Sequence, residues 1–226
     1  MRSSSTARKS RAETRAVRDL ERIKKFIAPL SPPVYAFAAS IRSTPFRILI
    51  SVLLSARTQD AVTEKAAARL LAAAATPDKM LGLSSAQVSG LIYPVGFFNT
   101  KAKNILKISA ILAQSKQFPS TLDALLQLPG IGRKSANLVL ALAFSRSAIA
   151  VDTHVFRISR RLGWASGRTP LAVETELESL FPRRLRASVN QVLVGFGQTI
   201  CRPISPKCPA CVLKKTCPSS SVTSNK

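Results

Sequence analysis

The sequence predicts an all-α protein, and three observations support this prediction. Helix-start signals recur along the chain, apolar residues between them follow helical spacing, and no convincing period-two run is bounded by turn residues. The clearest start signals are three Thr-Pro pairs, in which threonine suits the N-cap and proline the first helical position. These pairs are Thr44-Pro45, Thr76-Pro77 and Thr169-Pro170.

Other segments follow the same rules. Residues 46–54 place apolar side chains at helical spacing directly after the first Thr-Pro pair. Ser84 with Gln87 fits a capping box, and Ser120 with Asp123 fits its acidic variant. Short connections rich in proline, glycine and serine separate the segments, so we expect many short helices.

The charge of the chain points to a polyanionic partner. Its 226 residues include 34 Lys and Arg against 11 Asp and Glu, which gives a formal net charge of +23. Such an excess favours nucleic acid. An anionic membrane surface fits less well, because the positive charge is not confined to one amphipathic helix. The longest apolar run is interrupted by Arg146, so we expect no membrane-spanning segment.

The two ends of the chain look different from the middle. The N-terminal residues are rich in Arg and Ser and lack the apolar core of a secretory signal. An organelle transit peptide has a similar composition, but we favour a flexible basic arm over residues 1–19. Residues 218–226 are predicted to form a disordered tail.

The stretch LPGIGRKSANLVL predicts a helix-hairpin-helix. One short helix is expected over residues 120–128 and a second over 133–144, joined by a turn that includes Gly130, Ile131 and Gly132. The glycines permit positive φ and close approach of another backbone, and the N–H groups at a helix start can bind a phosphate. An ordinary αα-hairpin is the alternative. Residues predicted to contact DNA here are Leu128, Gly130, Ile131, Gly132 and Arg133.

Lys134 lies in the first turn of the second predicted helix, where a cation is disfavoured by the positive end of the helix dipole. This position favours the neutral amine over the ammonium, and a neutral amine can form a Schiff base with a carbonyl-like carbon. Lys134 is therefore a candidate nucleophile. Its neighbour Arg133 suits a phosphate or solvent.

A candidate acid lies downstream in the run VDTHVFR. Asp152 can cap the following helix, and a carboxylate can also stabilise a cationic intermediate or transfer a proton. His154 is the only histidine, and a structural role is the simpler interpretation.

All four cysteines lie near the C-terminus with the spacing C-x6-C-x2-C-x5-C. They are Cys201, Cys208, Cys211 and Cys217. Thiols this close together indicate a metal site rather than a disulfide framework, and the spacing alone leaves zinc and an iron–sulfur cluster open. Arg202 and Lys207 lie within the first cysteine interval and are candidate phosphate contacts.

Together these motifs resemble the endonuclease III family of DNA base-excision glycosylases. The stretches LLSARTQD and GFFNTKAKNI add to the resemblance, which extends over about residues 20–217. It implies two helical domains with a cleft between them. One is a six-helix barrel over 38–148, and the other combines 20–37 with 149–217 and holds a [4Fe–4S] cluster.

The resemblance also implies the chemistry. Lys134 matches the family's nucleophile, Asp152 its aspartate and the cysteines its cluster ligands. We therefore expect a bifunctional glycosylase and AP lyase that flips an oxidised pyrimidine out of duplex DNA, forms a Schiff base at C1′ and cleaves by β-elimination. A monofunctional mismatch glycosylase and a non-enzymatic helix-hairpin-helix or zinc-stapled DNA-binding protein are the alternatives.

Two positions depart from the common family pattern. Arg57 lies where many members carry the glutamine that fills the gap left by the flipped base, and Phe97 lies at a wedge position that is often leucine. Both are predicted to contact DNA, since either side chain can enter a base stack. We expect a cytoplasmic, nucleoid-associated monomer with damaged or abasic double-stranded DNA as partner and no membrane.

Overall fold

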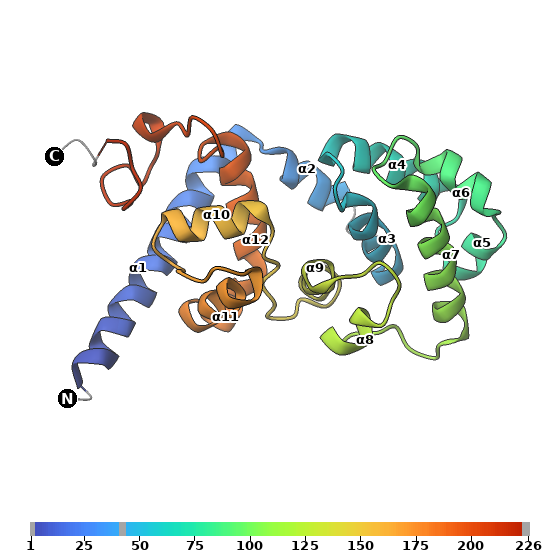
Figure 1. The fold of residues 1–226 in the computed structure, drawn as a ribbon, viewed down its shortest axis with the longest axis horizontal. Coiled ribbons are helices and arrows are strands. Elements are labelled where there is room, and N and C mark those ends of the chain that lie inside the picture. The colour runs from blue at the N-terminus through green and yellow to red at the C-terminus, as the bar shows by residue number, and fades with distance from the viewer. Residues whose placement is uncertain (1–2, 41–43, 223–226) are drawn as a thin grey trace. The chain divides into compact units, whose positions relative to one another are not determined.

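The computed structural model describes residues 3–40 and 44–222 (Figure 1). The described residues form helices, turns and loops without a strand, which confirms the all-α prediction. The helices are α1 (Ser3–Ile27), α2 (Pro33–Ser40), α3 (Pro45–Ser55), α4 (Asp60–Ala73), α5 (Pro77–Leu81), α6 (Ser85–Ile92), α7 (Phe98–Gln114), α8 (Leu122–Leu126), α9 (Arg133–Phe144), α10 (Thr153–Arg161), α11 (Pro170–Leu180) and α12 (Arg183–Thr199), with short 3-10 turns at Ala28–Leu30 and Cys208–Ala210.

The chain divides into two compact units. Unit 1 comprises residues 1–35 and 147–226, and unit 2 comprises residues 36–146. No helix of the described residues is both long enough and apolar enough to cross a membrane.

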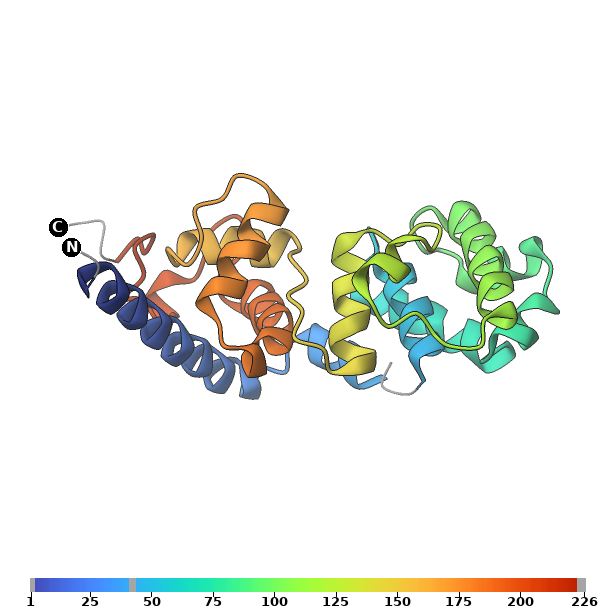
Figure 2. The ribbon, with the colours of Figure 1, turned by 90° about the horizontal axis from the view of Figure 1, so that it is seen from below.

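Unit 1 packs α1, α10, α11 and α12 around one apolar core. Phe181 and Phe196 are the largest side chains at its centre, and Trp164 packs edge-on against Phe181 with ring centroids 5.2 Å apart. Helix α1 lies beside α12 and runs past the C-terminal cysteine segment, drawn in blue and red in Figure 2.

The predicted flexible arm over residues 1–19 is wrong for most of its length. Helix α1 begins at Ser3, and Ala16 and Asp19 are buried. From Ala16 onward the helix is held by a stripe of apolar residues at helical spacing, through Ile27, that faces the core of unit 1. The basic residues between them cover the opposite side of the helix.

The predicted tail over 218–226 also needs correction. Residues 218–222 form turns, and Ser220 is buried, with its backbone N–H donating to the Cys217 carbonyl at 3.2 Å. The remainder of that tail, residues 223–226, lies outside the described residues.

Unit 2 is organised around α3. Residues 48–54 of this helix are all buried, and α4, α7 and α9 pack against it. A helix that is apolar on every side belongs in a core rather than at a surface. Helices α5 and α6 pack on α7, and α8 packs on α9 to form the predicted hairpin (Figure 2).

Most of the predicted helix starts are confirmed. Thr44, Thr76 and Thr169 each accept a hydrogen bond from the backbone N–H three residues later, and Ser84 with Gln87 forms a complete capping box.

The start predicted at Ser120 is wrong by one residue. Thr121 caps α8 instead, with its hydroxyl accepting from the Ala124 N–H at 3.3 Å. Either neighbouring hydroxyl can cap a helix, and Thr121 has the extended backbone that an N-cap residue typically adopts.

Gly130 is the position where the hairpin most needs glycine. Its φ is +81°, and a Cβ there would lie 2.4 Å from Asn104 Nδ2 and 3.3 Å from Leu53 Cδ1. The turn therefore rests directly on α3 and α7. Ile131, the next residue, is 5% exposed and fills the space behind the turn.

Gly130→Ala should lower the free energy of unfolding by about 1–2 kcal/mol, because alanine pays for positive φ and must displace Asn104. Gly132→Ala is the matched control, since a Cβ at Gly132 meets nothing within 4 Å and its φ is −93°. Denaturant titration of both variants measures the difference. Equal stability of the two would show that the turn is not constrained at Gly130.

Candidate active site

The hairpin presents the start of α9 with little side-chain protection. Gly132 is the N-cap of α9 and is exposed, and it has no side chain that could cap the first N–H groups. Leu128 and Ile131 are buried and anchor the turn from below. The partial positive charge of the helix start is therefore available to an anion, as the sequence suggested.

Lys134 follows in the first turn of α9 and is half-buried. Ala136, Val139 and Leu140 on the same helix are buried, so packing fixes the direction of α9 and with it the position of the Lys134 Cα. Arg133, its neighbour, is exposed.

Asp152 belongs to unit 1 and is described there by itself. It is the N-cap of α10, and its Oδ1 accepts from the Val155 N–H at 2.8 Å. The preceding residues 148–151 are buried, and Asn190 Nδ2 donates to the Ala150 carbonyl at 2.8 Å. The capping role weighed from the sequence is thus present, and the second carboxylate oxygen still has capacity to act.

Two loops of unit 2 carry the predicted DNA contacts Arg57 and Phe97. Arg57 lies between α3 and α4, and Phe97 lies between α6 and α7. Both are exposed, both have positive φ (+54° and +58°), and the Arg57 guanidinium carbon is 5.5 Å from the centre of the Phe97 ring. The structure brings these two residues together within unit 2.

Sequence reasoning missed Lys101. This residue of α7 is 6% exposed, and its Nζ donates to the carbonyl oxygens of Leu54 at 2.8 Å and Ala56 at 2.6 Å. A signal was present, because Lys101 occupies the apolar face of α7 one residue before Ala102 and four before Ile105. A cation at such a position needs buried acceptors.

The four cysteines line one cavity in unit 1. Its walls include the apolar side chains of Leu162, Phe196 and Ile200, together with Lys207 and Lys214. No three His, Cys, Asp or Glu side chains among the described residues are arranged to hold a metal ion. Four thiols around a common space are nevertheless the donor set that iron–sulfur clusters use.

Hydrogen-bond donors reach two of the four sulfurs. The Leu213 N–H donates to Cys211 Sγ at 3.3 Å, and Arg161 Nη1 lies 3.6 Å from Cys201 Sγ. Burial is the main cause that raises the pKa of the Cys211 and Cys217 thiols. The four cysteines fit a metal cluster in their donor chemistry and in lining one cavity, and no three of them are arranged around a single ion position.

Arginines of α10 hold the start of the cysteine loop, defined as residues 201–217. Arg157 donates to the Cys201 carbonyl at 3.0 Å, and Arg161 donates to the Arg202 carbonyl at 2.7 Å and the Pro203 carbonyl at 2.9 Å. These bonds turn the backbone of the first cysteine interval toward α10. Arg202 and Lys207, predicted to contact DNA, are exposed in this loop.

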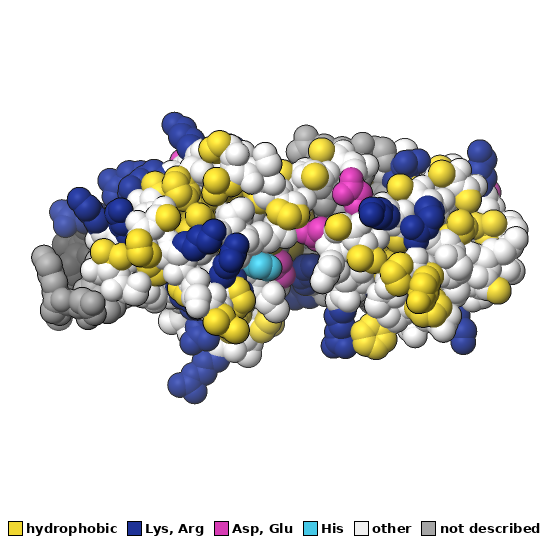
Figure 3. Space-filling model, turned by 90° about the horizontal axis from the view of Figure 1, so that it is seen from above, with side chains coloured by type: hydrophobic (Ala, Val, Ile, Leu, Met, Phe, Trp, Pro, Cys, Tyr) yellow, Lys and Arg dark blue, Asp and Glu magenta, His cyan; other side chains and the backbone are white. Residues whose placement is uncertain are grey.

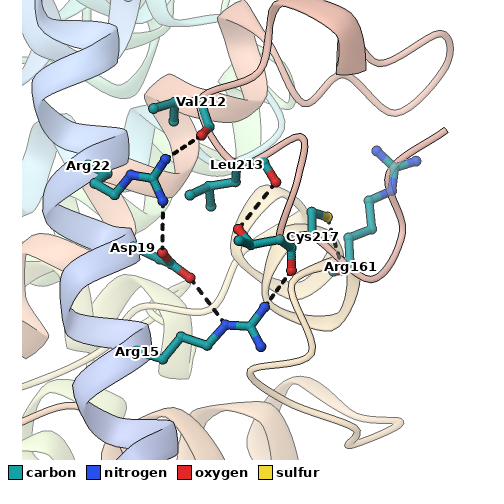
Figure 4. Close-up of polar contacts among 8 residues, drawn as sticks. Arg15, Asp19, Arg22, Arg161, Val212, Leu213 and Cys217 are labelled. Atoms are coloured by element: carbon teal, nitrogen blue, oxygen red, sulfur yellow. Dashed lines mark hydrogen bonds and ion pairs between the residues drawn. The ribbon is translucent and has the colours of Figure 1, made fainter. Parts of the chain in front are cut away.

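Helix α1 holds the other end of the loop, as Figure 4 shows. Asp19 is flanked by Arg15 and Arg22, with N···O distances of 3.6 Å to each. Arg22 donates to the Val212 carbonyl at 2.7 Å, and Arg15 donates to the Thr216 carbonyl. The buried Asp19 carboxylate thus orients two guanidinium groups that cap loop carbonyls.

The surface of the molecule is strongly cationic. On the face seen in Figure 3, Lys and Arg side chains outnumber Asp and Glu, and apolar side chains are scattered among them. This distribution agrees with the net charge of +23 and suits a polyanion.

Comparison with known proteins shows which family this chain belongs to. Residues 50–183 match the family described as the HhH-GPD superfamily of base excision DNA repair proteins. Endonuclease III of Thermotoga maritima is 45% identical over 175 residues, which cover 76% of this chain and 82% of that protein. Endonuclease III-like protein 1 of Bos taurus is 43% identical over 188 residues, covering 81% of this chain and 62% of that protein.

A solved structure shares the fold over almost the whole chain. The structure of a non-covalent endonuclease III–DNA complex aligns with a TM-score of 0.82 at 32% identity, covering 95% of this chain and 99% of the other.

The contacts of α1 predict that Arg22→Met will loosen the cysteine loop. Loss of the hydrogen bond to Val212 should speed tryptic cleavage after Lys214 or Lys215 about three- to tenfold, since a bond of this kind contributes about 1 kcal/mol. Lys25→Met is the control, because it removes an exposed cation from the same helix. Equal cleavage rates in both variants would contradict the anchoring role.

The burial of Lys101 predicts a pH-dependent stability. Burial lowers the pKa of its ammonium to about 8 in the folded protein, against about 10.4 in an unfolded chain. The unfolded state therefore binds more protons between these values, and the free energy of unfolding contributed by Lys101 rises with pH across that window. The rise should be about 1–3 kcal/mol.

Lys101→Met should lack this rise, and Lys103→Met, on the same helix but exposed, should keep it. Denaturant unfolding at about pH 7.5 and pH 10.5 measures the difference. A wild-type rise no larger than that of Lys101→Met would refute the assignment.

Proposed function

The chain belongs to the endonuclease III family of the HhH-GPD superfamily, and we propose that it is a bifunctional DNA glycosylase and AP lyase that removes oxidised pyrimidines from duplex DNA. The observation that carries the bifunctional assignment is Lys134, a half-buried lysine in the first turn of α9 behind an N-cap without a side chain. Enzymes that only hydrolyse the glycosidic bond use water as the nucleophile and therefore do not require an amine in the first turn of this helix.

DNA would be held through its phosphates. The exposed start of α9 after Gly132 can bind one phosphate, and the exposed Arg133 lies at the same helix end. Arg202 and Lys207 would bind further phosphates from the cysteine loop. Such contacts position the duplex without selecting a sequence.

Base removal begins with the damaged nucleotide rotated out of the duplex, since C1′ cannot be reached within the stack. The lone pair of Lys134 Nζ attacks C1′, a bond forms between Nζ and C1′, and the glycosidic bond breaks with the base taking the electron pair and a proton. Asp152 stabilises the positive charge on the sugar and assists the proton transfers.

Strand cleavage follows from the same covalent bond. The C1′–O4′ bond opens to give a Schiff base between Lys134 and the sugar, which acidifies the C2′ proton. Loss of that proton and of the 3′ phosphate oxygen breaks the strand by β-elimination. Water then hydrolyses the imine and returns Lys134 to its starting state.

The thiols of the cysteine loop would hold a [4Fe–4S] cluster, which supplies structural support rather than base-removal chemistry. The protein's own contribution is to bring four sulfurs to one cavity and to fix the loop at both ends through arginines of α1 and α10. A rigid loop keeps Arg202 and Lys207 ordered for phosphate binding.

The proposal predicts a covalent complex that depends on Lys134. The pure protein is incubated with duplex DNA carrying an abasic site or thymine glycol, and borohydride is added to reduce the imine. A protein–DNA crosslink is expected with the wild type, and Lys134→Gln should reduce it by at least about 10³-fold. Lys107→Gln, an exposed lysine of α7, controls for loss of charge.

Other outcomes separate the alternatives. Base release without a crosslink would indicate a monofunctional glycosylase in which Asp152 carries the chemistry. A crosslink that persists in Lys134→Gln would assign the nucleophile to another amine. DNA binding with neither base release nor a crosslink on oxidised or mismatched substrates would leave a DNA-binding protein without this activity.

A further inference from the structure

Arg57 and Phe97 are held in backbone conformations that their side chains do not favour. Both residues have positive φ, and neither is glycine, so each conformation costs about 1 kcal/mol or more. Both side chains are nevertheless exposed, with Phe97 61% exposed. Their own packing therefore does not hold the backbone, and the restraint must come from the groups beneath them.

The two loops that carry these residues are joined directly. The Gly96 N–H donates to Thr58 Oγ1 at 3.2 Å, which connects residues 38 positions apart. A Cβ at Gly96 would lie 2.6 Å from the Arg57 carbonyl oxygen, so the loops touch backbone to backbone. The stacking of Arg57 over Phe97 occurs above this contact.

Lys101 bridges the same two loops from below. Its backbone N–H donates to the Phe97 carbonyl at 3.0 Å, and its ammonium donates to the Leu54 and Ala56 carbonyls and, at 3.3 Å, to Thr58 Oγ1. The ammonium therefore satisfies carbonyl oxygens at the end of α3, where the helix dipole favours a cation. One residue fixes the first loop through its side chain and the second through its backbone.

Arg57 and Phe97 are the two residues expected to enter the duplex, and we propose that Lys101 is the positioning residue that holds them together as one preassembled wedge. The proposal rests on the function proposed above and adds a cause for duplex preference. Both loops are already ordered in the folded protein, so DNA binding does not lose the conformational entropy of ordering them. The two side chains enter the stack together rather than in sequence.

The proposal separates duplex from single-stranded substrates. A duplex that loses one nucleotide to the active site leaves a gap and an unpaired base, and the wedge occupies that space. A single strand with an abasic site has no such gap. Lys101→Met should therefore slow borohydride trapping on abasic duplex about 10- to 100-fold, the range expected for a small displacement of a binding group, and change trapping on the single strand less than about twofold.

A second variant keeps the test independent of the folding of Lys101→Met. Gly96→Ala leaves Lys101 intact but forces the two loops apart through the contact with the Arg57 carbonyl. It should lower duplex trapping with the same selectivity. Gly90→Ala is the matched control, because a Cβ at this residue of α6 meets nothing within 4 Å, and it should behave as the wild type.

A double-mutant cycle tests whether Lys101 acts through the wedge. Lys101→Met is combined with Arg57→Ala and Phe97→Ala, and duplex trapping is compared with that of the variant lacking only the wedge side chains. Lys101→Met should have no further effect in that background. A purely structural role would instead lower trapping in both backgrounds and on both substrates.

The outcomes keep the two proposals apart. Loss of trapping by Lys101→Met or Gly96→Ala that is equal on duplex and single strand, or additive with the wedge substitutions, would overturn the positioning role while leaving Lys134 chemistry intact. No trapping by the wild type on either substrate would overturn the proposed function itself. Selective loss on the duplex, absent from the wedge-deleted background, supports the preassembled wedge.

Discussion

The burial of helix α3 is the constraint on which the functional parts of unit 2 depend. Because residues 48–54 are enclosed on every side, α3 cannot shift without disturbing the core. Leu53 supports the hairpin turn at Gly130, and the last carbonyls of the helix receive the ammonium of Lys101. The start of α9 and the loop carrying Arg57 are therefore both held in position by contacts with one rigidly packed helix.

Local sequence rules predicted the parts of the fold that local forces determine. The caps at Thr44, Thr76 and Thr169 depend only on a hydroxyl and the next three residues, so they can be predicted from the sequence. The hairpin can be predicted for the same reason, because its turn and helix start lie in one short stretch of sequence. The motifs also placed Lys134 and Asp152 correctly at the starts of α9 and α10, although their chemical roles stay predictions.

Contacts between segments far apart in the chain could not be predicted from local sequence patterns. The hydrogen bond from Lys101 to Leu54 joins residues 47 positions apart, and no local sequence pattern predicts this pairing. The positive φ of Arg57 and Phe97 is likewise not predicted by their own conformational preferences. Residues 1–19 are a different case, because the apolar stripe that begins at Ala16 is present in the sequence and predicts a packed helix despite the basic composition.

Helix α10 has Asp152 as its N-cap and Arg161 in its last turn, and Arg161 holds the backbone that follows Cys201. Gly197 of α12 leaves so little room that a Cβ would lie 2.3 Å from His154 Nδ1 and 3.0 Å from Arg157 Nη2, so α10 is pressed against its neighbour between these two ends. For protein engineering, the carboxylate and the cysteine loop consequently form one module. A transplanted segment that kept Asp152 and omitted the loop would lose the hydrogen bonds through which α10 and the loop hold each other.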